Sequence, residues 1–570
     1  MIRKPVACIM VLCVMMSAIV HAAPVVKNVV LLVGDGMGYN QVIAGNYYRY
    51  GAETGAVFES FPVKYGMSTF EYGKGYDPVT AWADFNYVKQ NATDSASAST
   101  AMSTAIKTYN GAIGVNMGRM ALNHLISDFL AIGKAAGVVS SVPFSHATPA
   151  GFVAHNVSRN NYHAIAHEMI NSDLDVIIGA GHPWYNDNAG LLTKANYKYI
   201  NEADYNALVA GTAGAGRPWH FIDTKEGLED VANGAASPDR LFGLARVAST
   251  FQQSRSGDVK AGAYAVPQNT GIPSLAIATT AALRTLAKNS KGFFIMVEGG
   301  AIDWASHGNQ SGRLVEEQLE FVDAVQAAVD WVNQYSNWDE TVIIVTADHE
   351  CGYLTGPNSG PGPVWNPIAN NGAGNMPGME WHSTDHTNAL VPVYAKGPNV
   401  ASLSQWVVGA DPVRGNYIDN TGLANWMRLN ATDTRRMTGS VTTPGFVGQK
   451  ELLGLLATTT AGVQMVAVDP DGTFTVMNMM DWAIRVLFSA SRFLSVAHQA
   501  VVAGGDVHGV NLSLTSGDAD LDNQITLMDY LIIDAAFGNN EPAGDMDGDG
   551  QVTLFDYLVI DRVFGARGDD

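Results

Sequence analysis

The sequence predicts an α/β fold with a mostly parallel central sheet and helices on both faces, plus a small α-helical domain at the C-terminal end. Short apolar runs alternate with segments of helical spacing, which is typical of parallel strands buried on both faces. Acidic and histidine residues repeatedly follow these runs, at the sheet edge where open α/β folds bind ligands. Residues 514–570 instead repeat an acidic pattern, and each copy leads into a similar helical segment.

The composition excludes one class of partner. The chain has 570 residues, enough for one large domain and a smaller one, and is 47% hydrophobic and 15% charged. Its formal net charge of −21 argues against a nucleic-acid partner, because no basic field exists to neutralise phosphates. About half of this charge lies in residues 516–570, which hold twelve Asp and one Glu against two Arg.

The first residues predict export. Arg3 and Lys4 precede an apolar run over residues 5–20 and then small residues, so residues 1–22 are expected to be a signal peptide cleaved after Ala22. We expect a periplasmic or extracellular protein without a transmembrane segment, because no later run is long enough for one. The mature chain would keep only Cys351, so no internal disulfide is expected.

The elements follow in order along the chain. Helical spacing is clear in residues 274–287 and 313–332, whereas residues 184–268 are glycine-rich and irregular and are expected to be an insertion that shapes the rim. Continuous apolar runs predict buried strands at residues 27–33, 137–143, 175–179, 292–297, 340–346 and 391–395.

The first strand and the segment TDSASAST at residues 93–100 carry the first candidate site residues. Asp35 lies in a glycine-rich turn after the strand, but the spacing is not that of a dinucleotide loop, and a carboxylate would repel a pyrophosphate. A metal ligand is the better interpretation of Asp35. Ser95 directly follows Asp94, and a serine hydroxyl beside metal ions can act as a nucleophile.

Further candidates follow the later strands. Arg159 could offer a bidentate fork to a phosphoryl group, while His155 and His182 are interpreted as structural histidines. The remaining candidates lie after strands or just before the last one: His146, Thr148, Glu298, Asp303, Trp304, His307, Asp348, His349 and His386.

Taken together, these motifs resemble the bacterial members of the alkaline phosphatase family over residues 25 to about 450. The matching pieces occur in the family's order: DGMG at Asp35, TDSA at Ser95, ATPA at Thr148, SR at Arg159, VEGGAID at Glu298 and Asp303, ADHE at Asp348 and His349, and DHT at His386. The resemblance implies a catalytic domain over residues 23–455 with an alkaline phosphatase-like fold.

The resemblance also implies a site with two Zn²⁺ and one Mg²⁺, which agrees with the mixed and the all-oxygen donor sets. One zinc would take Asp303, His307 and His386. The second zinc would take Asp35, Asp348, His349 and the Ser95 oxygen. The magnesium would take Asp35, Thr148 and Glu298.

Small phosphate monoesters would be the implied substrates. Ser95 would form a phosphoserine that water hydrolyses, and Arg159 would clamp the phosphoryl oxygens. Asp94, His146 and Trp304 would surround the site. His146 stands where the best-known enterobacterial member has an acid and Trp304 where it has a lysine, whereas some marine members are similar to this chain at both.

Two alternatives stay open at this point. A phosphodiesterase of the same superfamily usually uses Thr and lacks a residue matching Arg159, which favours the monoesterase. A non-catalytic, metal-stabilised surface-binding protein would need neither Ser95 nor Arg159. Family members are often homodimers, so a homodimer is a further expectation.

The C-terminal repeat predicts calcium binding. Acids occupy loop positions 1, 3, 5 and 12, the spacing of a calcium loop, and Asn523 and Gly550 hold the sharp turn. The two sets are Asp518, Asp520, Asp522 and Asp529, then Asp545, Asp547, Asp549 and Asp556. Residues 514–570 resemble a type I dockerin, which implies Ca²⁺ and a cohesin-type partner on a surface scaffold, with residues 456–513 as a connector.

Overall fold

The computed structural model describes residues 26–432, 435–444, 446–448, 453, 455–459, 462–466, 468–469, 471–479, 483–490, 492–501 and 507–569. The expected signal peptide at residues 1–22 lies outside the described residues. Within the described ranges, no helix has both the length and the apolar character required to cross a membrane.

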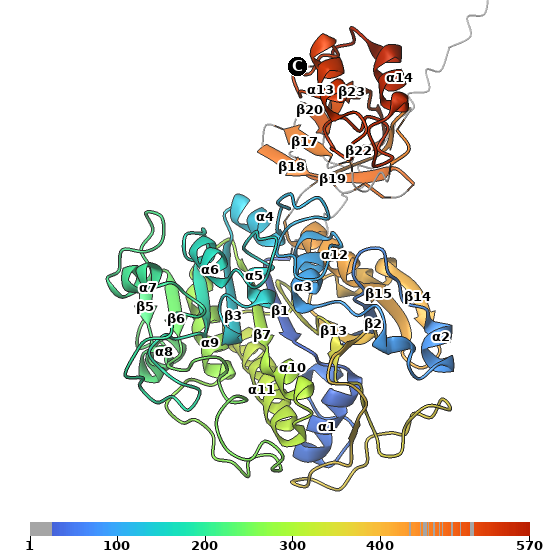
Figure 1. The fold of residues 1–570 in the computed structure, drawn as a ribbon. Coiled ribbons are helices and arrows are strands. Elements are labelled where there is room, and N and C mark those ends of the chain that lie inside the picture. The colour runs from blue at the N-terminus through green and yellow to red at the C-terminus, as the bar shows by residue number, and fades with distance from the viewer. Residues whose placement is uncertain are drawn as a thin grey trace, which may run out of the picture.

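An eleven-stranded sheet forms the centre of the larger unit (Figure 1). The strand order is β14-β15-β2-β13-β8-β1-β7-β3-β4-β6-β5, and the seven strands from β8 to β5 run parallel, while β13 pairs antiparallel with β8 and β2. The predicted α/β fold with a mostly parallel sheet is therefore confirmed. The strands are β1 Asn28–Gly34, β2 Val63–Ser68, β3 Ala135–Pro143, β4 Val176–Ala180, β5 His220–Ile222, β6 Leu241–Leu244, β7 Phe293–Gly299, β8 Thr341–Thr346, β13 Val391–Lys396, β14 Val407–Asp411 and β15 Gly415–Asp419.

Two layers of helices cover the sheet and bury its apolar strands. Helices α9 and α11 pack on each other and on β7, and α4 and α12 pack on each other from the other side, with α4 against β7 and α12 against β1 (Figure 1). Strands β1, β3, β7 and β8 are buried along their whole length as a result. The helices of this unit include α1 Tyr39–Tyr50, α2 Pro78–Ala83, α3 Ser95–Thr104, α4 Leu125–Ala131, α5 Ala147–Ala150, α6 Tyr162–Ile170, α7 Glu202–Val209, α8 Lys225–Asn233, α9 Leu275–Leu286, α10 Ala301–His307, α11 Ser311–Tyr335 and α12 Asn420–Ala431.

The irregular segment at residues 184–268 differs from its expected role as a rim insertion. It contributes β5 and β6, which extend the main sheet at one edge. These strands have three and four residues, so they are too short to give a periodic signal.

A second, all-β unit follows the large sheet. One sheet has the order β19-β16-β22 and the other β18-β17-β20-β21-β23, and the buried side chains between them include Val441, Val476 and Phe488. Strand β16 belongs to this unit but lies before residue 455, the expected end of the catalytic domain. The expected boundary between the catalytic domain and the connector therefore falls inside the β unit. The strands are β16 Arg435–Thr442, β17 Leu456–Thr459, β18 Gly462–Met465, β19 Thr473–Met479, β20 Ala483–Ala490, β21 Arg492–Val501, β22 Val507–Ser513 and β23 Ser516–Asp518.

Two helices, α13 Leu527–Ala536 and α14 Leu554–Val563, end the chain (Figure 1). Each begins with the same capping box, formed by Thr526 with Asp529 and by Thr553 with Asp556. Their small core includes Leu494 of β21, and β23 pairs with β21. The helical pair therefore shares its core and a sheet edge with the β unit, so it is not packed by itself.

Candidate active site

The site lies where several strands end, as the sequence predicts. Asp35 follows β1, Glu298 lies near the end of β7, and Asp348 follows β8, the three neighbouring strands at the sheet centre. Because these strands are parallel, their carboxyl ends meet at one edge. Helix α10 adds Asp303 and His307 beside them.

Ser95 is the first residue of α3 and is almost completely buried, with 2% of its surface exposed. Asp94 caps this helix by accepting a hydrogen bond from the Ser97 amide at 2.9 Å. The Ser95 Oγ lies 3.2 Å from Nε2 of His349. The hydroxyl is thus held at a helix N-terminus, where the helix dipole favours an anionic ligand.

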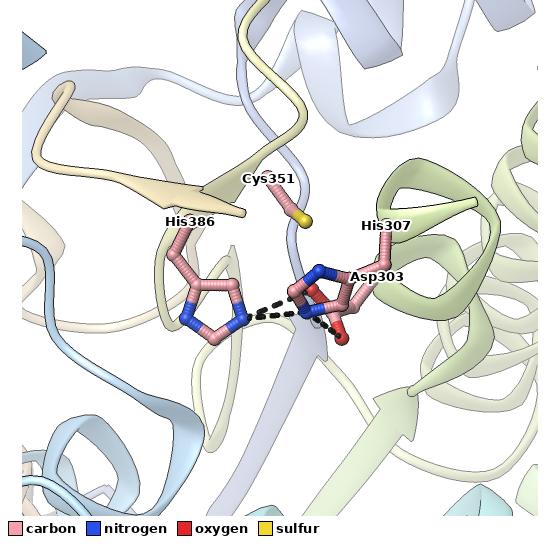
Figure 2. Close-up of side chains that lie close together, drawn as sticks. All are labelled: Asp303, His307, Cys351 and His386. Atoms are coloured by element: carbon pink, nitrogen blue, oxygen red, sulfur yellow. Dashed lines mark hydrogen bonds and ion pairs between the residues drawn. The ribbon is translucent and has the colours of Figure 1, made fainter. Parts of the chain in front are cut away.

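One group of donors consists of Asp303, His307 and His386 (Figure 2). The Nε2 atoms of the two histidines are 3.0 Å apart, and they lie 3.4 and 3.3 Å from the Asp303 carboxylate oxygens. His307 and His386 donate from Nδ1 to the backbone carbonyls of Thr384 and Thr93, at 2.6 and 2.9 Å. In the neutral form of this tautomer, Nε2 of each imidazole is the atom that can bind a metal.

A second group lies beside the first and contains Asp35, Asp348 and His349. Nε2 of His349 is 3.2 Å from Asp348 Oδ2 and 3.6 Å from Asp35 Oδ1. The other Asp348 oxygen, Oδ1, accepts hydrogen bonds from the amides of Gly36 and His349 at 3.2 and 2.9 Å. The Asp348 carboxylate is thus oriented by the backbone, with Oδ2 left for another ligand.

The third group is made only of oxygen donors and comprises Asp35, Thr148 and Glu298. Ser140 donates a hydrogen bond to Glu298 Oε2. Among the described residues, neither Asp35 carboxylate oxygen, the Thr148 hydroxyl nor Glu298 Oε1 has a hydrogen-bond partner, although all four atoms are buried. Buried polar atoms without partners are costly, so this arrangement fits a hard cation.

The electrostatics of the three groups also favour bound cations. Burial raises the pKa of Asp35, Glu298 and Asp348, and the charges of the neighbouring carboxylates raise it further. Burial also acts to raise the pKa of Asp303, but the hydrogen bond and charge of His386 outweigh this effect and lower it. Carboxylates packed so closely need positive charge nearby, and the donor types present fit two nitrogen- and oxygen-ligated metals and one oxygen-ligated metal.

Arg159 supplies a fixed positive charge at the edge of the site. Its Nη1 donates to Asp94 Oδ2 at 2.9 Å. Burial lowers the pKa of Arg159, but the charge and hydrogen bond of Asp94 outweigh this and raise it. Asp94 thereby links the helix that presents Ser95 to the guanidinium group.

The other predicted residues divide into two sets. The rings of His146 and Trp304 lie 5.5 Å apart, and burial together with the Arg159 charge lowers the pKa of His146 to about 3, so this imidazole is neutral. His155 pairs with Glu168 at 2.8 Å, and His182 lies 3.5 Å from Asp223. His155 and His182 have structural partners, in keeping with their interpretation as structural histidines.

Sequence reasoning missed three groups that orient the site. Glu298 is held by the hydroxyl of Ser140, His386 by the carbonyl of Thr93, and His307 by the carbonyl of Thr384. Ser140 lies on a predicted strand near the site edge, a signal that could have been used. The carbonyl contacts depend on loop paths that the sequence does not specify.

The two C-terminal acidic loops have matching geometry. The structure gathers carboxylate oxygens of Asp518, Asp520 and Asp529 in the first loop and of Asp545, Asp547 and Asp549 in the second. Equivalent backbone hydrogen bonds also recur: Asp522 and Asp549 accept from Gln524 and Gln551, and Asp529 and Asp556 accept from the two amides that follow the first aspartate of each loop. Asn523 and Gly550 have φ values of 66° and 89°, so both loops make the same left-handed turn.

Burial raises the pKa of Asp518 to about 6, and nearby acids add to the effect. In both loops, Oδ1 of the first aspartate is buried without a hydrogen bond to any described residue. The donors fit an oxygen-seeking cation such as Ca²⁺.

A mostly parallel α/β sheet whose carboxyl edge brings together a buried serine, an arginine and three groups of carboxylate and histidine side chains has the donor types that metal-dependent enzymes use. The model of the Alkaline phosphatase family matches residues 26–379, more than half of the chain. The chain belongs to the alkaline phosphatase family.

Individual relatives agree with this membership. Alkaline phosphatase 4 of Bacillus subtilis (strain 168) is 30% identical over 336 residues, which cover 58% of this chain and 62% of that protein. Alkaline phosphatase of Escherichia coli (strain K12) is 28% identical over 414 residues, 66% of this chain and 82% of that protein. The chain thus spans less than two thirds of the Bacillus relative.

Solved structures share the fold. Alkaline phosphatase from the Antarctic bacterium TAB5 superposes with a TM-score of 0.50 and 25% identity, covering 71% of this chain and 97% of that one. A cold-active alkaline phosphatase from Shewanella sp. gives a TM-score of 0.51 at 24% identity, covering 70% and 98%.

Proposed function

We propose that this chain is an exported, metal-dependent phosphomonoesterase that hydrolyses small phosphate monoesters through a phosphoserine at Ser95, with highest activity at alkaline pH. The observation that carries the proposal is the buried Ser95 hydroxyl, 3.2 Å from Nε2 of His349, in a site where buried oxygens of Asp35 and Asp348 accept no hydrogen bond from the described residues. A purely structural metal site would need no buried serine at its edge.

The chain's own residues account for the binding and orientation of the phosphoryl group. Ser95 Oγ attacks phosphorus, the bond to the leaving oxygen breaks, and water later cleaves the phosphoserine. The phosphoryl oxygens are held by the N-terminus of α3 and by Arg159. Asp94 contacts both groups and so fixes their relative position. When bound, two zinc ions would stabilise the attacking and leaving oxygens of the displacement.

The proposed metal ligands are those that the resemblance implies. Asp303, His307 and His386 would hold one zinc; Asp35, Asp348, His349 and Ser95 the second; and Asp35, Thr148 and Glu298 a magnesium. A variant of the TAB5 enzyme with one histidine replaced by aspartate is described with magnesium bound in its M3 site, which supports magnesium as a cofactor of this fold.

The test compares three substrates with the purified, metal-loaded protein: an aryl phosphate, an aryl phosphodiester and an aryl sulfate. We expect the phosphate monoester to turn over fastest, and exhaustive chelation to abolish activity until zinc and magnesium are restored. Faster turnover of the diester would favour the phosphodiesterase alternative. No turnover of any ester by the metal-loaded protein would favour a non-catalytic binding protein.

The C-terminal unit supports a second, binding function. Its two helices expose matching apolar side chains, each pair occupying the same place in the two repeats: Leu527 and Leu554, Met528 and Phe555, Leu531 and Leu558, Phe537 and Phe564. A duplicated apolar face of this size is typical of a protein-binding surface. We therefore propose that calcium orders residues 514–570 and that a cohesin-type domain on a surface scaffold is their partner; a homodimer of the catalytic unit stays a further proposal.

A further inference from the structure

A cysteine lies against the group formed by Asp303, His307 and His386. Cys351 belongs to the short strand β9, Glu350–Cys351, which pairs antiparallel with β12, His386–Thr387. The register places Cys351 directly opposite His386, and the Cys351 amide donates to the Gly36 carbonyl at 3.1 Å. The side chain is completely buried, so backbone pairing on two sides fixes where the thiol lies.

The sulfur shares its surroundings with three side chains of two types, aspartate and histidine, that commonly bind metals. One ligand atom from each of Asp303, His307, Cys351 and His386 lies within 4.8 Å of the other three (Figure 2). Figure 2 shows these side chains directed toward a common region, with His386 and Cys351 arriving from the paired strands and Asp303 and His307 from α10. Four donors from two sides can therefore surround one ion.

A second observation points to a ligand at the same place. Asp303 is 95% buried, and within the described part of the chain its Oδ1 makes no hydrogen bond beyond the ion-pair contact of 3.3 Å with Nε2 of His386. The distances among Asp303, His307 and His386 are 3.0–3.4 Å. Donors around a tetrahedral zinc with bonds of about 2.0–2.3 Å lie roughly 3.3–3.8 Å apart, so the group needs little adjustment to accept an ion.

We propose that Cys351 Sγ binds the same metal ion as Asp303, His307 and His386, giving that ion a sulfur ligand in addition to its nitrogen and oxygen ligands. This inference rests on the proposed metal site. The thiol loses its proton to solvent as the Zn–S bond forms, and no oxidation is involved. Four protein donors close a tetrahedral site, so this ion binds the phosphoryl oxygen only by accepting a fifth ligand.

Zinc X-ray absorption of the full chain loaded with two zinc ions tests the proposal directly. We expect a sulfur shell at about 2.3 Å, with about one sulfur for every two zinc ions, that disappears in Cys351→Ala and Cys351→Ser. Replacing zinc by Co²⁺ should give a thiolate-to-cobalt absorption band in the near ultraviolet that both variants lack. Zinc affinity, measured by competition with a chelator, should fall in both variants by at least the roughly 10-fold that losing an outer-shell partner costs.

The matched control is Ser306→Ala. Ser306 is a buried residue of α10 whose hydroxyl bonds only to the Ile302 carbonyl among the described residues, so the variant should keep the sulfur shell and the affinity. The metal-free stabilities of all variants are compared by thermal unfolding, which separates loss of a ligand from loss of packing. Zinc-loaded, active protein without a sulfur shell overturns the cysteine proposal and leaves the proposed function intact. Failure to bind zinc at all overturns both.

Discussion

At the scale of single residues, replacing Ser95 and replacing Arg159 should affect the reaction in different ways. Ser95→Ala removes the nucleophile, so no phosphoenzyme should form and turnover should fall by about 10⁶-fold. Arg159→Ala should raise the KM and slow turnover by roughly 10²- to 10³-fold, while a phosphoserine still forms, because the clamp is electrostatic. Acid trapping of labelled phosphoenzyme together with steady-state kinetics measures both effects.

Ser99→Ala is the control for this comparison. Ser99 is a buried serine in the same helix, and its hydroxyl bonds to the carbonyls of Ala96 and Ala147. It should trap phosphate as the parent protein does. Trapped phosphoserine in Ser95→Ala would place the nucleophile elsewhere.

Ser140 offers a residue-scale test of the all-oxygen group. Its hydroxyl donates to Glu298 Oε2 and accepts from the Val142 amide at 3.0 Å. Without the hydroxyl, Glu298 loses an orienting partner, so Ser140→Ala should weaken magnesium binding about 10- to 100-fold and leave zinc content unchanged. Magnesium titration of the zinc-loaded protein measures this.

A second serine variant separates this effect from general loss of a buried hydroxyl. Ser103→Ala removes a buried hydroxyl that donates to the Gly151 carbonyl, outside the three donor groups, and should leave magnesium binding unchanged. Equal magnesium affinity in Ser140→Ala and the parent protein would contradict the role given to Ser140.

At the scale of elements, α11 buries an acid that has no catalytic role in the proposed mechanism. Glu317 is 3% exposed, and burial, helped by the charges of Glu320 and Glu316, raises its pKa well above 4.5. Folding therefore favours the protonated form, and this stability is present below pH 4.5 and lost as the pH rises toward the folded pKa. Glu317→Gln should match the parent protein in stability below pH 4.5. Between pH 4.5 and the folded pKa, the variant should become more stable than the parent by up to about 1.4 kcal/mol for each pH unit.

Denaturant unfolding of the metal-loaded proteins across the pH range measures this difference. Glu316→Gln is the contrasting variant, because Glu316 pairs with the buried Arg255 at 2.6 Å. Removing one partner of that pair should destabilise the fold by about 3–5 kcal/mol at neutral pH. Parallel stability curves for Glu317→Gln and the parent would show that Glu317 ionises normally in the fold.

Element length explains what the sequence could and could not predict. The runs at residues 27–33, 292–297 and 340–346 are long and apolar, so their strands and the acids that follow them could be predicted. Strand β6 has four residues and β12 has two, so both are too short to show a periodic pattern of apolar residues. The opposition of Cys351 and His386 depends on pairing between such short strands, which local sequence does not specify.

At the scale of the whole molecule, catalysis and calcium binding should be separable. All proposed catalytic and metal-binding residues of the active site lie between Asp35 and His386, within the unit built around the large sheet. Removing the chain after residue 432 should leave full phosphatase activity, measured with an aryl phosphate. A loss beyond about tenfold, with the shortened protein folded, would show that the β unit supports the site.

Calcium should act only on the C-terminal part of the full chain. Repulsion among the loop aspartates opposes folding, so calcium should protect residues 514–570 from protease, and chelation by a calcium-selective agent should expose them. Asp518→Ala combined with Asp545→Ala should abolish the protection without changing phosphatase activity. Equal protection with and without calcium would exclude a calcium-dependent fold.

The central place of β1 has a consequence for how the chain reaches its fold. This strand is made well before residues 293–299 and 341–346, the strands β7 and β8 with which it pairs. Most of its contacts are therefore distant in sequence, which delays folding. The centre of the sheet therefore cannot form until residues 341–346 have been made, so the residues between β1 and β8 lack their native core until then.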